Sequence, residues 1–282
     1  MIKGLSRAGI GDAGTVEQFV KLAAAHGFGA IDASAGELGA WADEVGLEQA
    51  LATLREQGVQ IGTMGLSVDW RTTDEAYRAG LAKLGAEAAI AAKFGVRACC
   101  TYVLPSTDLK AAHFMALATA RLRTCARVLG AYGIRLGLEF VGPHHLRTRW
   151  ANPFVWTLEE TLDWIDAIGE PNVGLLFDAY HWYTTESDLD AIRALRPEQI
   201  VHVHLNDAKS VPVAEALDND RVYPGEGVID LAGFLRELHA IGYKGVVAQE
   251  ILSQQPPQDS AQTLARRSAD GFAKVYAAAG LE

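Results

Sequence analysis

Short apolar segments alternate with amphipathic segments of helical period along the chain, and this alternation restricts its fold more than any other feature. Short segments rich in β-branched residues indicate buried strands, and longer ones with apolar residues three or four apart indicate helices. Strands are expected at residues 2–5, 30–32, 59–64, 96–102, 134–140, 173–178, 200–205 and 245–251. Helices are expected between them, among others at residues 15–26, 74–94, 109–132, 158–168, 231–241 and 261–279.

Eight strand–helix units of this kind follow one another without a linker or a change of composition. Strict alternation of strand and helix predicts a parallel sheet, and eight units close into a barrel. We therefore predict an α/β fold, a single (β/α)8 TIM barrel that takes up residues 1–282 as one domain. A doubly wound open sheet is the alternative, but it needs a glycine-rich phosphate loop after an early strand, and the sequence has none.

The composition limits the partners of such a barrel. With 25 Lys and Arg against 35 Asp and Glu, the formal charge is −10, which disfavours nucleic acid and anionic membrane surfaces. No segment has the length and hydrophobicity of a membrane span. The cysteines Cys99, Cys100 and Cys125 are odd in number and form no CxxC, as expected of reduced thiols. We expect a cytoplasmic protein with a small-molecule substrate; it could form a homo-oligomer, although no interface is readable.

Four consecutive predicted strands end in a residue that can bind a metal ion. These residues are Glu139, Asp178, His204 and Glu250. A single carboxylate at a strand end is more commonly a solvated loop residue or a helix cap. Four that follow buried apolar runs and point to one barrel mouth are better explained by a shared cation. Three oxygens and one imidazole nitrogen suit one divalent ion such as Mn²⁺, Mg²⁺, Co²⁺ or Zn²⁺.

The motifs around these residues resemble a known family. They are Leu-Glu-Phe at 138–140, Phe-Asp-Ala-Tyr-His at 177–181, Val-His-Leu-Asn-Asp at 203–207, Tyr-Pro-Gly-Glu-Gly at 223–227 and Gln-Glu at 249–250. In order and spacing they are similar to the xylose-isomerase-like TIM-barrel superfamily, in the branch of ketose 3-epimerases, inosose isomerases and dehydratases, and sugar-phosphate isomerases. The resemblance implies that Glu139, Asp178, His204 and Glu250 are the metal ligands, with Mn²⁺ the first choice. It also implies that His181 faces the substrate and that both glutamates act as acid and base.

The chemistry explains why these residue types are needed. A metal ion that binds a carbonyl and a neighbouring hydroxyl stabilises the cis-enediolate formed when the adjacent proton leaves. Glu139 or Glu250 can remove that proton, and the other can return it; the sequence does not show which acts first. We therefore expect a metal-dependent isomerase or epimerase of a keto-sugar or keto-polyol.

Three alternatives use the same fold. A lyase or dehydratase of a keto-sugar, inosose or 3-keto-glycoside would begin with the same proton abstraction. A sugar-binding barrel without catalysis would be expected to lack a ligand, and all four are present. An endonuclease for abasic DNA would need further histidines on the early strands, which the sequence does not show, and the negative charge opposes it.

Further candidates lie in the expected loops. His145, Arg147, Lys209 and Trp182 are predicted to contact substrate, together with His181. Ketose 3-epimerases have an arginine soon after the histidine ligand, whereas the first arginine after His204 here is Arg221. This departure from their pattern argues against simple ketose epimerisation.

Two residues beside the histidine ligand have open roles. His202 is expected on the same side of its strand as His204, in the core or supporting the site. Asp207 could orient His204 or cap the next helix.

Overall fold

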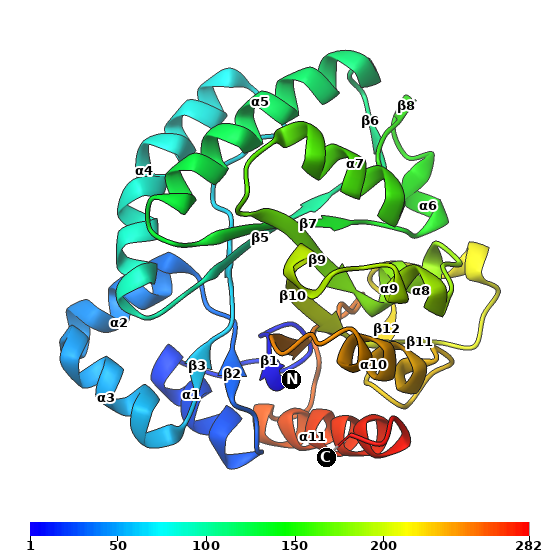
Figure 1. Cartoon of the computed structure of the whole chain (residues 1–282). Coiled ribbons are helices and arrows are strands. Elements are labelled where there is room, and N and C mark those ends of the chain that lie inside the picture. The colour runs from blue at the N-terminus through cyan, green and yellow to red at the C-terminus, as the bar shows by residue number, and fades with distance from the viewer. Residues whose placement is uncertain (282) are drawn as a thin grey trace.

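The computed structural model describes residues 1–281, which form an α/β barrel of parallel strands surrounded by helices (Figure 1). Its strands are β1 (Ile2–Leu5), β2 (Ala30–Ile31), β3 (Gln60–Ile61), β4 (Met64–Gly65), β5 (Ala98–Val103), β7 (Arg135–Phe140), β9 (Val173–Asp178), β10 (Ile200–Leu205) and β13 (Val246–Gln249). Strands covered on both faces are apolar almost throughout, and every residue of β9 is buried. The predicted barrel is confirmed, and β9 and β10 have the expected bounds.

The third strand of the barrel is broken in two. The sheet order is β3-β2-β1-β13-β10-β9-β7-β5-β4, and only Gly62 and Thr63 separate its end strands β3 and β4 along the chain. β3 pairs with β2 and β4 pairs with β5, so the barrel closes apart from this break. The sequence predicted one strand over 59–64. It is interrupted where the Asp32 carboxylate accepts the amide N–H of Thr63 at 3.1 Å.

The helices cover the outside of the sheet (Figure 1). Thr15, Ser34 and Thr157 each begin a helix with a capping box, in which the side chains of the first and fourth residues satisfy each other's amide groups. The α-helices are α1 (Val16–Ala25), α2 (Ala35–Val45), α3 (Leu47–Gln57), α4 (Asp74–Lys93), α5 (Ala111–Gly130), α6 (His144–Arg147), α7 (Leu158–Ile168), α8 (Ala179–Thr184), α9 (Leu189–Arg193), α10 (Leu231–Ala240) and α11 (Ala261–Ala278). Two 3₁₀ turns are η1 (Pro197–Gln199) and η2 (Val213–Glu215). None of the helices in residues 1–281 is long and apolar enough to cross a membrane.

Two groups of apolar side chains form the interior. The larger group lies between the sheet and the helices and includes Trp70 and Phe234, which are fully buried. The smaller group consists of Ala30, Val246 and Ala248, with Ile2 packed against it. Because alternate residues of a strand point to opposite faces, this smaller group lies inside the barrel. The polar residues of the site lie beyond it, at the C-terminal ends of the strands.

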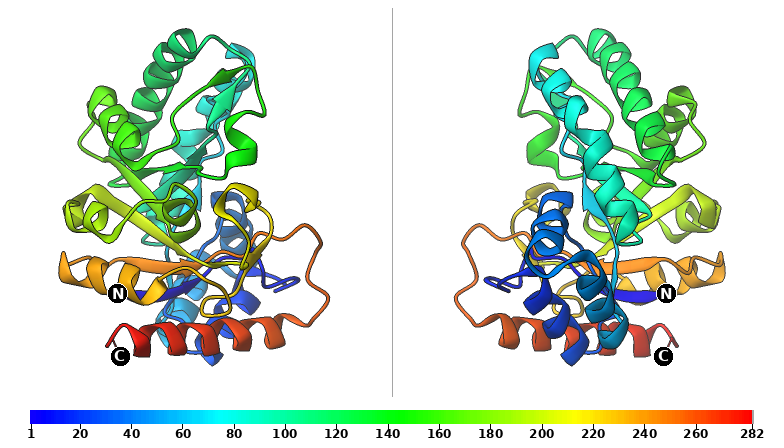
Figure 2. Two further views of the ribbon diagram at one scale, coloured as in Figure 1. Left: turned by 90° about the vertical axis from the view of Figure 1, so that its right-hand side faces the viewer. Right: turned by 90° about the vertical axis from the view of Figure 1, so that its left-hand side faces the viewer.

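Two short antiparallel ladders stand at that end. β6 (Ser106–Thr107) pairs with β8 (Asn152–Pro153), and β11 (Asp207–Ala208) pairs with β12 (Arg221–Val222). The segments after β10 (yellow) and after β13 (orange) project on the same side of the molecule (Figure 2). The second ladder folds the segment after β10 back towards the barrel, and this return shapes the site.

Candidate metal centre

Four side chains that can bind a metal meet at the C-terminal end of the barrel. Glu139, Asp178 and His204 lie on β7, β9 and β10, and Glu250 directly follows β13. One donor atom of each lies within 4.8 Å of the others. Nδ1 of His204 is 3.4 Å from Oε1 of Glu139, 3.7 Å from Oδ2 of Asp178 and 3.4 Å from Oε2 of Glu250. The residues that the sequence analysis expected to be ligands therefore form one cluster, called the ligand cluster below.

The register of the sheet produces this arrangement. His204 pairs with Asp178 on one side and with Ala248, two residues before Glu250, on the other. Gly137 shares the inward face of β7 with Glu139, and a Cβ at Gly137 would lie 2.9 Å from Sγ of Cys100. The glycine thus lets the strands approach closely just below the cluster.

The donor set fits a divalent cation. Oε1 of Glu139 and Nδ1 of His204 are buried and have no hydrogen-bond partner. Buried polar atoms without a partner are costly, and a cation between them would remove that cost. Three carboxylate oxygens and one imidazole nitrogen are ligands that Mn²⁺, Mg²⁺, Co²⁺ and Zn²⁺ all accept.

Arg221 adds a positive charge to the ligand cluster, and the sequence analysis missed it. Its Nη1 lies 2.9 Å from both Oδ2 of Asp178 and Oε2 of Glu250, and the side chain is 1% exposed. It belongs to β12, which the pairing with β11 brings back to the barrel. The first arginine that follows His204 in the chain therefore lies at the ligand cluster.

His181 lies beside the ligand cluster, at the start of the segment after β9. Its Nδ1 accepts the amide N–H of Gly142 at 3.3 Å, and its Nε2 lies 3.4 Å from Nη2 of Arg221. Asp218 receives a hydrogen bond of 2.7 Å from the same Nη2. The backbone contact therefore fixes the imidazole next to the candidate ligands.

Neighbouring charges separate the pKa values of the three carboxyl groups in the ligand cluster. Burial raises the pKa of Asp178, but the charges of Arg221, His181 and His204 outweigh burial and hold it at about 2. Burial also opposes ionisation of Glu250, yet His204 and Arg221 lower its pKa. Glu139 keeps a raised pKa, because burial dominates and the charge of Glu250 adds to it. The two glutamates thus occupy different electrostatic environments.

Arg147 and Trp182, both expected to contact substrate, are engaged elsewhere. Arg147 donates hydrogen bonds of 2.7 Å to the carbonyl oxygens of Gly142 and Thr184, so it joins the loop after β7 to the end of α8. Trp182 is 5% exposed and packs against Phe234 of α10. The structure does not bring either side chain into the ligand cluster.

His145 and Lys209 are also outside the ligand cluster. His145 lies in α6, and its Nδ1 is buried without a hydrogen-bond partner. Lys209 pairs with Asp220 at 2.7 Å and is half exposed. Contacts of these two residues with a substrate stay predictions.

Asp207 has neither of the two roles that the sequence left open. Its carboxylate accepts the amide N–H groups of Ala208, Gly225, Gly227 and Ile229, at 2.9–3.0 Å. It therefore holds the loop between β12 and α10 and does not contact His204 or cap that helix, whose N-cap is Asp230.

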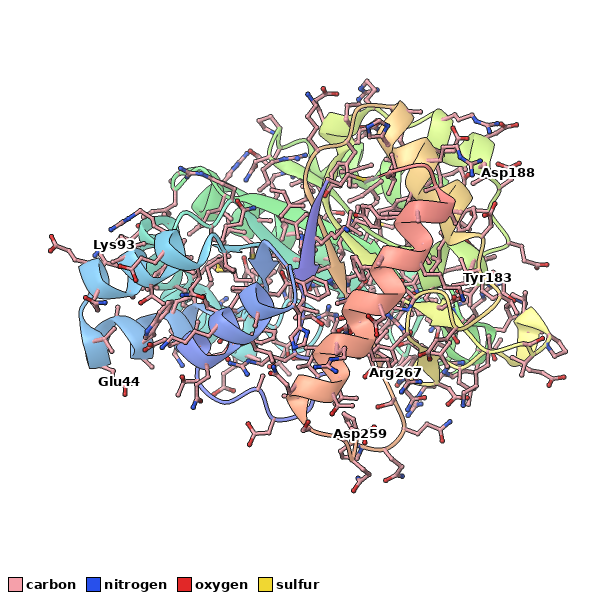
Figure 3. The ribbon with its side chains drawn as sticks, turned by 90° about the horizontal axis from the view of Figure 1, so that it is seen from below. Glu44, Lys93, Tyr183, Asp188, Asp259 and Arg267 are labelled. Atoms are coloured by element: carbon pink, nitrogen blue, oxygen red, sulfur yellow. The ribbon has the colours of Figure 1, made fainter. Side chains whose placement is uncertain are left out.

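Glu226, the acidic residue of the loop between β12 and α10, is held by a residue of α11. Glu226 pairs through both oxygens with Arg267 of α11, which Figure 3 shows on the underside of the molecule.

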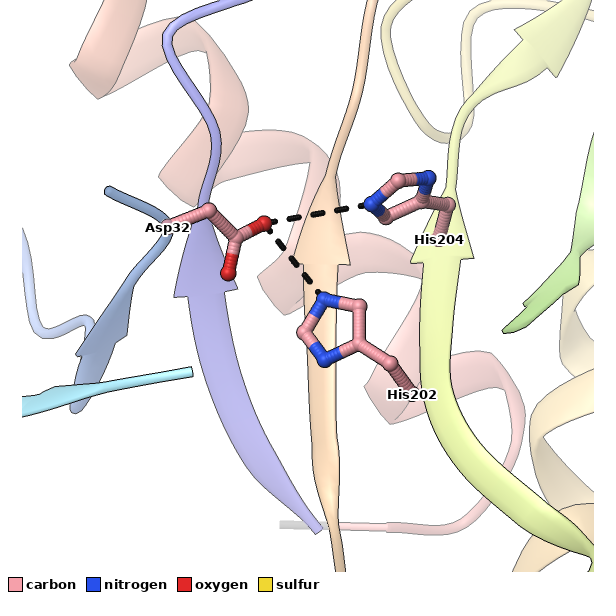
Figure 4. Close-up of side chains that lie close together, drawn as sticks. All are labelled: Asp32, His202 and His204. Atoms are coloured by element: carbon pink, nitrogen blue, oxygen red, sulfur yellow. Dashed lines mark ion pairs between the residues drawn. The ribbon is translucent and has the colours of Figure 1, made fainter. Parts of the chain in front are cut away.

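Asp32 is a second residue that the sequence analysis missed. It directly follows β2, and its Oδ2 lies 3.4 Å from Nε2 of His202 and 3.8 Å from Nε2 of His204 (Figure 4). The sequence did place an aspartate at the end of a predicted strand, which was a usable signal. His202 lies on the same side of β10 as His204, as expected, with 5.2 Å between the ring centroids.

Comparison with known proteins agrees with this geometry. A family model described as "Xylose isomerase-like TIM barrel" matches residues 20–273. The chain belongs to this family. A xylose isomerase domain protein from Alicyclobacillus acidocaldarius has a solved structure that covers 99% of both chains, with 33% identity and a TM-score of 0.90. The IolI protein, solved with a bound zinc atom, covers 98% of both chains at 18% identity and a TM-score of 0.81, which shows the common fold.

Relatives of known activity match over shorter segments. An inosose isomerase from Bacillus velezensis is 37% identical over 43% of this chain and 40% of its own length. A 3-dehydroshikimate dehydratase from Pseudomonas aeruginosa is 31% identical over 49% of this chain and 21% of its own length. A D-psicose 3-epimerase from Enterocloster bolteae is 26% identical over 48% of this chain and 39% of its own length. The chain thus spans less than half the length of these three relatives.

Proposed function

We propose that this family member is a divalent-metal-dependent isomerase or epimerase of a keto-sugar or keto-polyol. The meeting of Glu139, Asp178, His204 and Glu250 in the ligand cluster carries the proposal, because it combines a cation site with carboxylates that can transfer protons. The relatives named as inosose isomerase and D-psicose 3-epimerase act on hydroxylated carbonyl compounds, which supports this substrate class.

The four residues of the ligand cluster would hold the ion, and Mn²⁺ is our first choice. When bound, the ion acts as a Lewis acid on the carbonyl oxygen of the substrate. Glu139 and Glu250 stand on β7 and just beyond β13, with β9 and β10 between them. In this proposal they approach the reacting carbon from different sides. One takes the proton next to the carbonyl, the electron pair moves onto the carbonyl oxygen, and the other returns a proton.

Arg221 and His181 would support the charge that develops on the substrate. The guanidinium is already buried and fixed by Asp178 and Asp218, so it needs no reorganisation during the reaction. Nε2 of His181 lies beside it and faces the same region. N–H groups placed in this way stabilise an oxygen that becomes negative.

Dehydration is the second candidate, favoured by the 31% identity to a 3-dehydroshikimate dehydratase. It starts with the same proton removal. A hydroxyl group on the next carbon then leaves with a proton as water, and a C=C bond forms. The reaction products separate the two candidates.

The test is proton exchange in D₂O followed by NMR. Mn²⁺-loaded protein is incubated with ketoses, inososes, 3-keto-glycosides and 3-dehydroshikimate, and the metal is removed before the spectra are recorded. We expect deuterium next to the carbonyl of at least one compound, and the product then distinguishes epimerisation, isomerisation and dehydration.

The variants Glu139→Gln and Glu250→Gln should lose exchange, and their metal content is measured so that metal loss is separated from loss of the base. Glu226→Gln is the matched control, because Glu226 pairs with Arg267 away from the ligand cluster. Tight binding of a sugar without exchange would contradict the proposal and indicate a sugar-binding barrel.

A further inference from the structure

A second group of polar side chains lies inside the barrel, adjoining the ligand cluster (Figure 4). Asp32, from the end of β2, points at His202 and His204 of β10. β1 and β13 separate these two strands in the sheet, so the contact crosses the inside of the barrel. The side chains are 14%, 1% and 8% exposed, respectively. Such a buried carboxylate requires partners that satisfy its charge.

The two oxygens of Asp32 have different surroundings. Oδ1 accepts the amide N–H of Thr63 at 3.1 Å, in the break between β3 and β4. Oδ2 has no conventional hydrogen bond, and neither has Nε2 of His202, its neighbour at 3.4 Å. At Gly62 a Cβ would lie 2.8 Å from Oδ1 of Asp32 and 3.4 Å from Cε1 of His202. Glycine at this position thus leaves the room that the carboxylate and the imidazole occupy.

The two nitrogens of His204 face different groups. Nδ1 lies among the oxygens of Glu139, Asp178 and Glu250, whereas Nε2 faces Oδ2 of Asp32 at 3.8 Å. A neutral imidazole has one N–H and one lone pair. A lone pair on Nδ1, available to a cation, places the proton on Nε2, on the side of the ring that faces the carboxylate. The same Oδ2 lies 3.4 Å from Nε2 of His202.

We propose that Asp32 is a positioning residue for the metal centre, which holds His204 in the orientation and tautomer that present Nδ1 to the ion. His202, which lies on β10 like His204, contacts Asp32 and keeps it in place. This inference rests on the metal-dependent function proposed above. Carboxylates that accept the second N–H of a metal-binding histidine commonly contribute 10–100-fold to metal affinity.

A second cation held by Asp32, His202 and His204 is the rival explanation, because the three donor atoms lie within 4.8 Å of one another. If both sites were filled, His204 would have to donate lone pairs from both nitrogens and therefore lose its last proton. The positioning role needs only a neutral ring. The two explanations predict different metal stoichiometries, one or two ions per chain.

Zn²⁺, which is diamagnetic, is the probe. Its dissociation constant is measured by competition with a chelator for the wild type, Asp32→Ala and Asp32→Asn, and ¹⁵N-labelled histidine reports the imidazole N–H groups of the loaded protein. We expect one Zn²⁺ per chain, about 10–100-fold weaker binding in Asp32→Ala, and a smaller loss in Asp32→Asn, which keeps one acceptor oxygen. The protected Nε2–H signal of His204 should be lost in Asp32→Ala.

Glu237→Gln is the control for a generic effect of removing a buried charge. Glu237 is buried on α10 and pairs with Arg193. The Glu237→Gln variant should have a lower free energy of unfolding, with the same Zn²⁺ affinity and the same His204 signal as the wild type. Unchanged affinity and an unchanged signal in Asp32→Ala would overturn the positioning role alone, and so would a second Zn²⁺ that Asp32→Ala abolishes. A wild type that binds no divalent ion would overturn the proposed function together with this inference.

Discussion

The loop held by Asp207 provides a prediction that the structure makes quantitative. The change is Asp207→Ala, which removes the acceptor of four backbone N–H groups. Ala208 and Ile229 are buried, so their N–H groups would be left without water, whereas Gly225 is partly exposed and Gly227 exposed, so theirs can be solvated. The effect therefore comes mainly from two of the four bonds.

A buried N–H group without a partner costs about 1–3 kcal/mol, so the two together cost about 2–6 kcal/mol. Burial raises the pKa of Asp207 in spite of the four N–H groups that lower it, which means that burying the carboxylate is itself unfavourable. Removing it recovers part of that cost. We therefore expect the free energy of unfolding to fall by about 2–4 kcal/mol.

The assay is urea unfolding followed by circular dichroism, supported by thermal melts. In a chain of this size the expected loss lowers Tm by roughly 4–16 °C. Asp230→Ala is the comparison, since it removes one cap to Gly233 and should cost about 1 kcal/mol. A free energy of unfolding for Asp207→Ala within about 0.5 kcal/mol of the wild type would refute the reasoning.

Two further predictions concern charge and thiol chemistry. Arg221→Met removes the cation that contacts Asp178 and Glu250, so we expect the metal-free protein to lose about 3–5 kcal/mol in urea unfolding. Added Mn²⁺ should then raise the Tm of the variant more than that of the wild type, because the ion replaces the missing charge; an equal rise would contradict this. The three cysteines are buried, and burial raises the pKa of Cys100 and of Cys125 to about 12, so a disulfide reagent at pH 8 should label none in the folded protein and three in urea. Labelling of the folded protein would show that the barrel opens.

Local patterns in the sequence predicted the strands that carry the ligands. β9 is a continuous apolar run that ends at Asp178, and β10 carries His202 and His204 between apolar residues; both strands have the bounds expected from the sequence. Their order along a parallel barrel was then enough to bring Asp178 and His204 together. The same rule, that the C-terminal ends of the strands meet at one mouth, predicts that Glu139 and Glu250 join them.

Residues placed by long-range contacts could not be predicted in this way. Arg221 reaches the ligand cluster through the pairing of β11 with β12, which no local pattern marks. Trp182 stands next to His181 in the chain, yet the turn of α8 directs it against Phe234. The contact between Asp32 and Thr63 joins residues that are far apart in the sequence. The Asp32 carboxylate accepts the Thr63 N–H where the strand is interrupted, and no local pattern predicts this.

The unequal lengths of the barrel strands have a consequence for how the mouth of the barrel moves. β5, β7, β9 and β10 have six residues each, whereas β2, β3 and β4 have two each. Long ladders open rarely because many bonds must break together, so amide hydrogen exchange should be slow on one side of the barrel and fast on the other. Glu139, Asp178 and His204 lie on the slow side. We therefore expect the mouth to widen at the short strands while these three side chains keep their spacing.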